Sequence, residues 1–523
     1  MPTIEELRQT RIDKLKKLET AGVLAYPAKT NRNHSVAEVL ENFAKLSKSK
    51  KQVIIAGRIM AQRGHGGATF LDVNDGSATL TAGGSTVKRS WFAKKAETAK
   101  TEKSESKIQV IIKQDKVGEK GYQFFMDVFD IGDFVEIKGT LFTTKRGEKT
   151  IEADDYKMLT KSLLPLPDKW CGFTDTEDCL RKRYLDILFN PEIKEMIKKR
   201  SIFWNAMREF LMQRNFLEVE TPVLETTPGG ADARPFKTHH NALDLDVYLR
   251  ISMGELWQKE LMVAGFEKTF EIGRQFRNEG MDAEHLQDYT QMEFYWAYAN
   301  SENGMELVEE MYKYVAEKTF GTLQFKIRGF DIDLGQKWEK YDFVSTVAQY
   351  TGVNLETATL SDMEKAIVKL KIHCEGFSAQ GGPASGWNKA RAMDNLWKFC
   401  RKQIAGPGFL INTPIEVSPL AKKNEKNEKL VQRFQVILAG SENGNGYSEL
   451  NDPIDQAERF AQQQKLRDAG DLEAQMHDKD FVEALEHGMP PTCGFGLSER
   501  LFSFLMDKPA RDCQIFPLMR PKA

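Results

Sequence analysis

Hydrophobic residues near the N-terminus recur at helical spacing. Residues 3–22 carry apolar side chains on one face of a helix, at Ile4, Leu7, Ile12, Leu15 and Leu18. This spacing predicts an amphipathic α-helix within an N-terminal segment that we place at residues 1–48.

The hydrophobic pattern changes to short β-rich runs after residue 49. Five such runs are separated by Gly, Asp and Asn: QVIIAGRIMAQ, ATFLDVND, KIQVIIKQD, GDFVEIKGTLFTT and KTIEADDYKML. Five short strands with turn residues between them predict a small β-barrel over residues 49–163. The charged run KRSWFAKKAETAKTEKSESK, at residues 88–107, predicts a long loop inserted into the barrel and not a sixth strand.

Helical and strand patterns mix in the rest of the chain, residues 176–523. Prolines in LPLPDKW mark a linker over residues 164–175. The next helical pattern, IKKRSIFWNAMREFLMQRNF, runs into FLEVETPVL, which alternates as a strand does and meets a proline. Residues 375–396 begin Gly-rich and are weakly patterned. We therefore expect an α+β protein: a barrel, then a larger mixed domain.

Composition excludes several classes of protein. The chain is 41% hydrophobic and 29% charged, and no run approaches about 18 uncharged apolar residues, so we expect no membrane span. The N-terminus lacks the apolar core of a secretory signal. The six cysteines show no CxxC spacing, which argues against a zinc site or a disulfide scaffold and favours the cytoplasm.

Charge is divided unevenly along the chain. Residues 1–165 hold 29 Lys and Arg against 21 Asp and Glu, a net of +8, whereas the remainder holds 45 against 55, a net of −10. A basic module joined to an acidic one indicates a polyanionic partner for the first. A solvated surface with a lysine-rich loop explains the same numbers.

Three segments resemble the signature motifs of class II aminoacyl-tRNA synthetases. They are RNFLEVETPVL, EIGRQFRNEG…H…YTQMEFY and GFGLSERL, in motif regions at about 198–224, 268–298 and 490–521. Three further segments narrow the resemblance to lysyl-tRNA synthetases: GGADARPFKTHHNALDLDVYLRI, PIEVSPLAK and ENGNGYSELNDPIDQAERF. It extends over residues 3–521, and it implies an anticodon-binding OB-fold followed by a catalytic domain built on an antiparallel sheet flanked by helices.

The resemblance implies a two-step reaction. The lysine carboxylate attacks the α-phosphate of ATP, which gives lysyl-adenylate and pyrophosphate, and the 3′ end of tRNA(Lys) then accepts the lysyl group. Because the first step brings two anions together, the site needs fixed positive charge. The family also implies Mg²⁺ bound with ATP and a homodimer formed through motif 1.

The resemblance places six residues around ATP. Arg277 bridges the substrate carboxylate and the α-phosphate, and Arg500 lies against the γ-phosphate or the base, so these two are the catalytic candidates. Glu279 accepts from the adenine amino group, Tyr289 stacks on adenine, and His285 lies near the β- or γ-phosphate. The sixth ATP-binding residue is Glu442. Structural alternatives are an Arg277–Glu279 ion pair, a loop histidine and a core tyrosine.

A second set of residues is expected to bind lysine. The acids Glu293 and Glu449 stand where aspartate-specific relatives need cations, and two carboxylates around a cavity suit the lysine ε-ammonium between them. Tyr295 meets the same ammonium. Glu255 and the Gly230 backbone hold the α-ammonium. The remaining members of the lysine-binding set are Arg277, Asn445, which contacts the substrate carboxylate, and Tyr447. A pair of purely structural acids is the alternative for Glu293 and Glu449.

The expected metal ligands depart from the family pattern. Glu442 matches one carboxylate ligand of Mg²⁺, but the acid that usually stands seven residues earlier is Gln435 here. An amide oxygen adds no negative charge, so we expect a weakened or water-mediated site. Glu449 is a further candidate ligand.

In the barrel, Phe70 resembles the family's base-stacking aromatic, and Arg58 and Glu148 resemble other anticodon contacts. A barrel-core role is the alternative for Phe70. For the whole chain we retain three other functions: an aspartyl- or asparaginyl-type synthetase, a relative that lysylates a protein, and a tRNA-binding protein with a decayed catalytic site. The relatives of the second kind lack the barrel.

Overall fold

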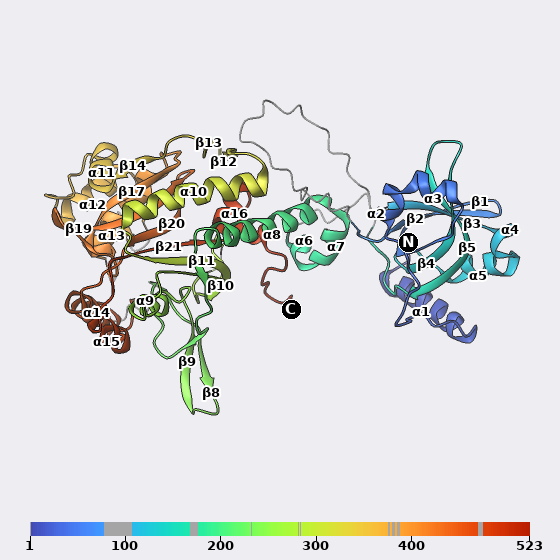
Figure 1. Cartoon of the computed structure of the whole chain (residues 1–523), viewed down its shortest axis with the longest axis horizontal. Coiled ribbons are helices and arrows are strands. Elements are labelled where there is room, and N and C mark those ends of the chain that lie inside the picture. Colours follow the sequence, from blue (N-terminus) through green and yellow to red (C-terminus); the bar gives the residue numbers. More distant parts are fainter. Residues whose placement is uncertain are drawn as a thin grey trace. The chain divides into compact units, whose positions relative to one another are not determined.

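The structure, a computed structural model of the chain, forms two compact units, Met1–Gly172 and Phe173–Ala523 (Figure 1). The residues it describes are 2–77, 107–167, 176–231, 233–280, 282, 284–374, 377–378, 382–383, 387–468 and 474–522. The predicted loop at 88–107 therefore lies outside the described residues except for Lys107. The end of the predicted linker, 168–175, also lies outside them.

The first unit contains the predicted closed barrel of five strands, in the order β1-β2-β3-β5-β4. Among the described strands of this unit, only β3 and β5 pair in parallel, and β1 closes the barrel on β4. This arrangement is consistent with an OB-fold. The strands are β1 (Val53–His65), β2 (Ala68–Asn74), β3 (Lys107–Lys113), β4 (Phe134–Thr143) and β5 (Lys149–Thr160). The helices are α1 (Ile4–Thr20), α2 (Val36–Glu41), α3 (Phe43–Ser49), α4 (Gln114–Val117) and α5 (Glu119–Val128).

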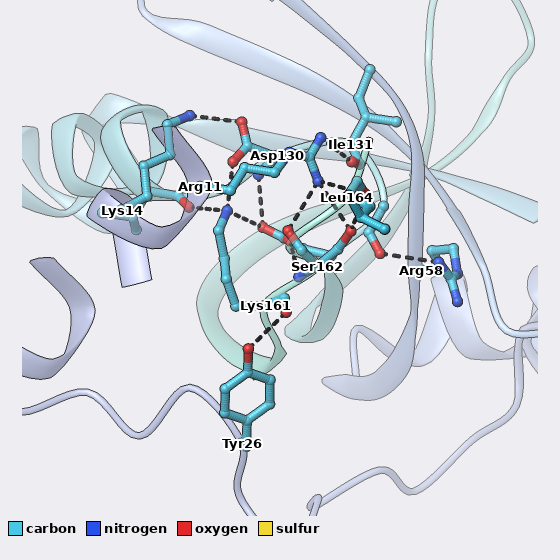
Figure 2. Close-up of polar contacts among 12 residues, drawn as sticks. Arg11, Lys14, Tyr26, Arg58, Asp130, Ile131, Lys161, Ser162 and Leu164 are labelled. Atoms are coloured by element: carbon cyan, nitrogen blue, oxygen red, sulfur yellow. Dashed lines mark hydrogen bonds and ion pairs between the residues drawn. The ribbon is translucent and has the colours of Figure 1, made fainter. Parts of the chain in front are cut away.

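The N-terminal helix α1 is fixed to the barrel by apolar and polar contacts. Leu18 is fully buried in the barrel core. Arg11 donates to the carbonyl oxygens of Ser162 and Ile131, at 3.1 and 3.0 Å (Figure 2). Of the predicted apolar face of α1, Leu18 is buried and Leu7, Ile12 and Leu15 are half-buried, but Ile4 is 62% exposed. Arg11 shows that the same helix also binds the segment that leaves the barrel.

The second unit is built on a nine-stranded sheet with the order β14-β17-β19-β20-β21-β11-β10-β6, in which β18 pairs with β19. Neighbouring strands are antiparallel except β14–β17 and β10–β6. The strands are β6 (Leu217–Glu218), β10 (Lys268–Phe276), β11 (Asp288–Ala297), β14 (Glu339–Asp342), β17 (Gly408–Pro414), β18 (Lys423–Asn424), β19 (Asn427–Leu438), β20 (Ser441–Ser448) and β21 (Thr492–Ser498).

Two long helices cover one face of this sheet (Figure 1). Helix α8 (Pro191–Met212) packs on α10 (Ser301–Phe320). Buried residues of both helices join buried sheet residues such as Phe294, Phe434 and Phe495 in the largest core cluster. The opposite sheet face is therefore left for the candidate site. This arrangement is the predicted antiparallel sheet flanked by helices.

Further elements surround the sheet. The short strands are β7 (Leu224–Glu225), β8 (Lys237–His240), β9 (Leu245–Leu249), β12 (Gln324–Ile327), β13 (Phe330–Asp333), β15 (Phe377–Ser378) and β16 (Gly382–Pro383). The helices are α6 (Thr176–Arg181), α7 (Arg183–Phe189), α9 (Glu255–Val263), α11 (Phe343–Thr351), α12 (Leu360–Lys369), α13 (Lys389–Arg401), α14 (Pro453–Asp468), α15 (Lys479–Glu486) and α16 (Arg500–Leu505), with 3₁₀ turns η1 (Ile415–Val417) and η2 (Ala510–Cys513).

Helix α13 corrects one sequence interpretation. We described residues 375–396 as weakly patterned, yet the helix begins at Lys389. Ala392, Met393, Leu396 and Trp397 give it a buried apolar face, whose helical spacing is hidden by the Gly-rich residues before it. Much of the Gly-rich part, residues 375–386, lies outside the described residues.

Candidate active site

A cavity of about 440 Å³ opens on the sheet face opposite α8 and α10. Its floor consists of two rows of residues that run across β19, β20, β21 and β11 in register. The rows are Gln435–Asn445–Gly496–Glu293 and Arg433–Tyr447–Gly494–Tyr295. Because alternate residues of a strand share a face, the sheet brings predicted lysine-binding residues from distant motifs into one floor.

Glycines at the centre of both rows leave room for the acidic side chains. A Cβ atom at Gly494 would lie 2.1 Å from Oε1 of Glu449 and 2.6 Å from the Tyr295 ring. A Cβ atom at Gly496 would lie 3.0 Å from Cγ of Glu293. A larger residue at Gly494 would therefore displace the carboxylate of Glu449.

The Glu293 carboxylate is buried and held by three donors. The Met253 amide and the Gln291 side chain donate to its Oε1 at 3.0 and 2.5 Å, and the Tyr295 hydroxyl donates to Oε2 at 3.0 Å. Burial, with a smaller contribution from the charge of Glu255, nevertheless raises the pKa of Glu293 to about 7. The carboxylate is thus fixed in position and poised to ionise when a cation arrives.

A buried lysine joins the other two acids at this end of the cavity. Nζ of Lys259 lies 2.7 Å from Oε1 of Glu255 and 2.6 Å from Oε2 of Glu449. The Tyr447 hydroxyl also donates to Oε1 of Glu255. Sequence reasoning did not select Lys259, although its i,i+4 spacing from Glu255 on a helix would have placed both on one face.

The substrate-carboxylate and α-ammonium candidates are also positioned. Arg433 donates to Oδ1 of Asn445 at 2.7 Å, which fixes the amide orientation. Gly230 has φ +84°, and a Cβ there would lie 2.6 Å from the Ser252 hydroxyl and 2.7 Å from Cβ of Glu255. Only glycine brings the backbone this close to Glu255 without strain.

The loop between β10 and β11 carries Arg277, Glu279 and His285 beside the cavity. Arg277 donates to the Ile251 carbonyl at 3.3 Å and lies 5.8 Å from the centre of the Tyr289 ring. The structure does not join Arg277 to Glu279 as an ion pair, and Glu279 is exposed. His285 instead pairs with Asp282 at 2.7 Å. Arg277 and Glu279 are thus both available to a ligand.

Arg500 lies at the far end of the cavity, at the first residue of α16. It donates to the Ser441 hydroxyl at 2.9 Å and lies 3.9 Å from Glu284. Burial lowers the pKa of Arg500 from its ordinary value, without bringing it near neutrality. The cavity lining therefore combines three arginines, Arg277, Arg433 and Arg500, with several carboxylates.

The predicted metal ligands do not form a ready-made cation site. Oε1 of Glu442 accepts from the Trp397 indole at 2.6 Å and from Arg401 at 3.0 Å. Gln435 is neutral, and Glu449 is paired with Lys259. A resident divalent ion would compete with a guanidinium and meet only one carboxylate, that of Glu442. Among the described residues, no group of three or more His, Cys, Asp or Glu is suited to a metal.

Comparison with known proteins identifies this arrangement. The family model "tRNA synthetases class II (D, K and N)" matches residues 175–520. The chain belongs to the class II tRNA synthetases.

Proteins similar to this class II synthetase align with 99% of its length. Proteins named lysine–tRNA ligase are 41% identical in Thermoanaerobacter sp. (99% of this chain, 97% of the relative) and 41% identical in Carboxydothermus hydrogenoformans (99% of both). One from Clostridium botulinum is 40% identical, over 99% of this chain and 96% of its own. The similarity therefore includes the barrel as well as the catalytic unit.

The three predicted anticodon contacts have different surroundings in the barrel of this synthetase. Phe70 is half-buried on β2 and is not part of the barrel core, whereas its neighbours Leu71 and Val73 are. Because strand residues alternate between faces, this favours the outward role of Phe70. Arg58 stacks 4.3 Å from the centre of the Phe134 ring and donates to the Gly132 carbonyl (Figure 2). Glu148 is exposed at the turn between β4 and β5.

Proposed function

We propose that the chain is a lysine–tRNA ligase, which activates L-lysine with ATP and transfers it to tRNA(Lys). The observation that carries the proposal is the set of buried carboxylates of Glu255, Glu293 and Glu449 at one end of a class II synthetase cavity. Buried acids favour a cationic ligand, because an ammonium both pairs with them and offsets the cost of burying them.

The cavity supports the proposed positions for lysine. The ε-ammonium lies among Glu293, Glu449 and the Tyr295 hydroxyl, and the α-ammonium lies at Glu255 and the Gly230 backbone. The Asn445 amide meets the substrate carboxylate, and Tyr447 lines the pocket between these groups. Asn445 and Tyr447 are neighbours on one strand face, which suits one extended amino acid lying along it.

The proposed reaction uses two arginines that line the cavity, Arg277 and Arg500. Arg277 holds the substrate carboxylate and the α-phosphate of ATP together, and Arg500 binds charge developing on the leaving pyrophosphate. Tyr289 lies beneath adenine, with Glu279 at its amino group and His285 near the phosphates. Bond formation between the carboxylate oxygen and the α-phosphorus releases pyrophosphate, and the tRNA hydroxyl then takes the lysyl group and releases AMP.

Mg²⁺ enters this proposal as a partner of ATP and not as a resident ion. Glu442 keeps its charge: burial raises the pKa of this carboxylate, but Arg401, the Trp397 hydrogen bond and Arg433 together outweigh burial and keep it below its ordinary value. Glu442 and Gln435 are the residues that would face the ion beside the phosphates. When bound, the ion supplies additional positive charge for the pyrophosphate.

The barrel is the proposed anticodon-binding module, at residues 49–163. Phe70 offers an aromatic face outside the barrel core, and such stacking contributes about 1–3 kcal/mol per base. Arg58 and Glu148 are the proposed polar contacts. The net charge of +8 over residues 1–165 favours attraction to the tRNA backbone.

A homodimer and a cytoplasmic location complete the proposal. The motif 1 region exposes large apolar side chains, among them Leu217, Val223 and Leu224 at 50%, 41% and 47%. Exposed apolar side chains of this kind suit a two-fold interface. Cys374, Cys400, Cys493 and Cys513 are free thiols, which fits a reducing compartment. None of the described helices is long and apolar enough to cross a membrane.

An ATP–pyrophosphate exchange assay with each of the twenty amino acids tests the proposed function. Lysine alone should support strong exchange. The aspartate- or asparagine-specific alternative predicts exchange with those amino acids instead, and a decayed site predicts exchange with none.

A further inference from the structure

Lys259 occupies an unusual place for a charged side chain. Its side chain is 1% exposed, and its ammonium lies between Glu255 and Glu449, which are themselves 6% and 1% exposed. The ring centres of Tyr447 and Phe481 lie 5.5 and 5.9 Å from Nζ. A buried cation with this much aromatic and carboxylate cover is held at considerable desolvation cost, so its position calls for a reason.

Glu255 and Glu449 each contact the ammonium of Lys259 through one of their two carboxylate oxygens. Glu449 uses Oε2, while its Oε1 lies towards Gly494, whose missing Cβ would be 2.1 Å away. Glu255 uses Oε1 for both Lys259 and Tyr447. The second oxygen of each carboxylate is therefore the one left for a ligand, and Lys259 fixes the direction in which it points.

Charges at this end of the cavity suit a dication once Lys259 is included. The carboxylates of Glu255, Glu293 and Glu449 carry three negative charges when ionised, and Lys259 carries one positive charge. The net of two negative charges equals the charge of the two ammonium groups of L-lysine, whose carboxylate is taken by Arg277. Without Lys259, one buried carboxylate would have no counter-ion.

We propose that Lys259 is a positioning and specificity-determining residue for lysine activation: it is a resident counter-ion that aligns Glu255 and Glu449 for the two substrate ammonium groups. This inference rests on the proposed function, because it assumes that lysine occupies the acidic end. Lys259 acts through the two glutamates and takes no part in bond making.

The surroundings of the cluster favour a charged Lys259. The titratable groups around it are Glu255 on α9, Glu293 and Tyr295 on β11, Tyr447 on β20, and Glu449 directly after β20. Burial by itself lowers the pKa of Lys259, but the carboxylates of Glu255 and Glu449 outweigh burial and raise it. Helix α15 contributes the Phe481 ring, which also favours a cation.

The test replaces Lys259 in the full chain and follows lysine-dependent pyrophosphate exchange over a range of pH. Lys259→Met should raise the lysine KM about tenfold or more at pH 7 and leave the ATP KM near wild type. Its lysine KM should recover at higher pH, because the acids then ionise without their counter-ion. Lys259→Arg, which keeps the charge, should raise the lysine KM less than Lys259→Met does. Lys313→Met is the matched control, since Lys313 forms a similar i,i+4 pair with Glu309 on α10 away from the cavity.

Chemical rescue separates charge from packing and covers poor folding of the Met variant. In Lys259→Ala, n-propylammonium replaces the lost side chain, and 1-propanol fills similar space without charge. Restoration of a low lysine KM by the ammonium alone is expected. Equal rescue by both, or a Met variant with the wild-type lysine KM and pH profile, would overturn this inference. Absence of lysine-dependent exchange in the wild type would instead reject the proposed function, and this inference with it.

Discussion

Arg401 of α13 lies 3.0 Å from Oε1 of Glu442 on β20, and so a protein cation already occupies the carboxylate expected to hold Mg²⁺. Gln435, across the strand pair on β19, adds no charge to compensate. The two features together leave the pyrophosphate end of the cavity with little affinity of its own for a divalent ion.

Calorimetric titration of Mg²⁺ into the nucleotide-free protein should therefore give little or no heat. Gln435→Glu should create a measurable site, because a second carboxylate supplies the charge that the amide lacks. Arg401→Gln in that background should strengthen it further by releasing Glu442. A tight site in the wild type that Gln435→Glu leaves unchanged would show that other residues hold the ion.

Removal of one charge from the lysine pocket should reduce lysine use strongly. After Glu449→Gln, Lys259 pairs with Glu255 alone, and the substrate ε-ammonium has Glu293 as its one remaining carboxylate. Truncation of one partner of a buried charge pair costs about 2–5 kcal/mol. The measurement is kcat/KM for lysine in steady-state activation. Glu428→Gln, at an exposed position of β19, is the control. A Glu449→Gln enzyme within about a factor of two of wild type would remove Glu449 from the pocket.

Lysine binding should release protons near neutral pH. Burial raises the pKa of Glu293 to about 7, so this carboxyl holds a proton below that pH, whereas Glu449 is paired with the ammonium of Lys259. Ammonium binding requires the ionised form, and lysine affinity should therefore rise with pH between about 6 and 8. Titrations in two buffers of different ionisation enthalpy count the protons. A pH-independent affinity without proton release would mean that Glu293 is already ionised in the empty pocket.

A substitution on the outer face of the barrel should weaken tRNA charging and leave amino-acid activation intact. Phe70→Ala removes a stacking surface outside the barrel core and should weaken aminoacylation by about 1–3 kcal/mol, with exchange near normal. Rising salt should weaken tRNA binding steeply. Phe124→Ala, which removes an aromatic packed against the core from α5, controls for lost stability. Equal losses of aminoacylation and exchange in Phe70→Ala would indicate misfolding of the barrel.

The described apolar surface around motif 1 should be covered in solution. Sedimentation at micromolar concentration should show about twice the 59.6 kDa chain mass, and Leu217→Lys should shift the species towards the monomer. Ile454→Lys, which adds the same charge at an exposed apolar position outside motif 1, tests whether the effect is local. A wild-type protein that remains monomeric would reject the dimer.

Sequence predicted those parts of the molecule that depend on local pattern. The barrel strands follow from short β-rich runs separated by Gly, Asp and Asn, such as the run that forms β2. The sheet floor was predictable only through the family resemblance, since its residues come from separate motifs. No periodicity indicates that Glu293 lies opposite Gly496.

Polar pairs between residues far apart in the chain could not be predicted from the sequence. Trp397 and Glu442 are 45 residues apart, and their contact depends on how α13 packs against the sheet. Lys161, which is fully buried between Asp130 and Asp133 in the barrel (Figure 2), looks like a surface lysine in the sequence. Pairing alone makes its burial tolerable. Such pairs follow from tertiary packing and leave no trace in hydropathy.

Exchange of labelled pyrophosphate into ATP, measured with each of the twenty amino acids, tests most directly that this acidic cavity selects lysine. Strong exchange with lysine, little with the others and its loss in Glu293→Gln are expected, because the buried carboxylates need a cation. Exchange driven by aspartate or asparagine, or undiminished lysine exchange in Glu293→Gln, would contradict the assignment.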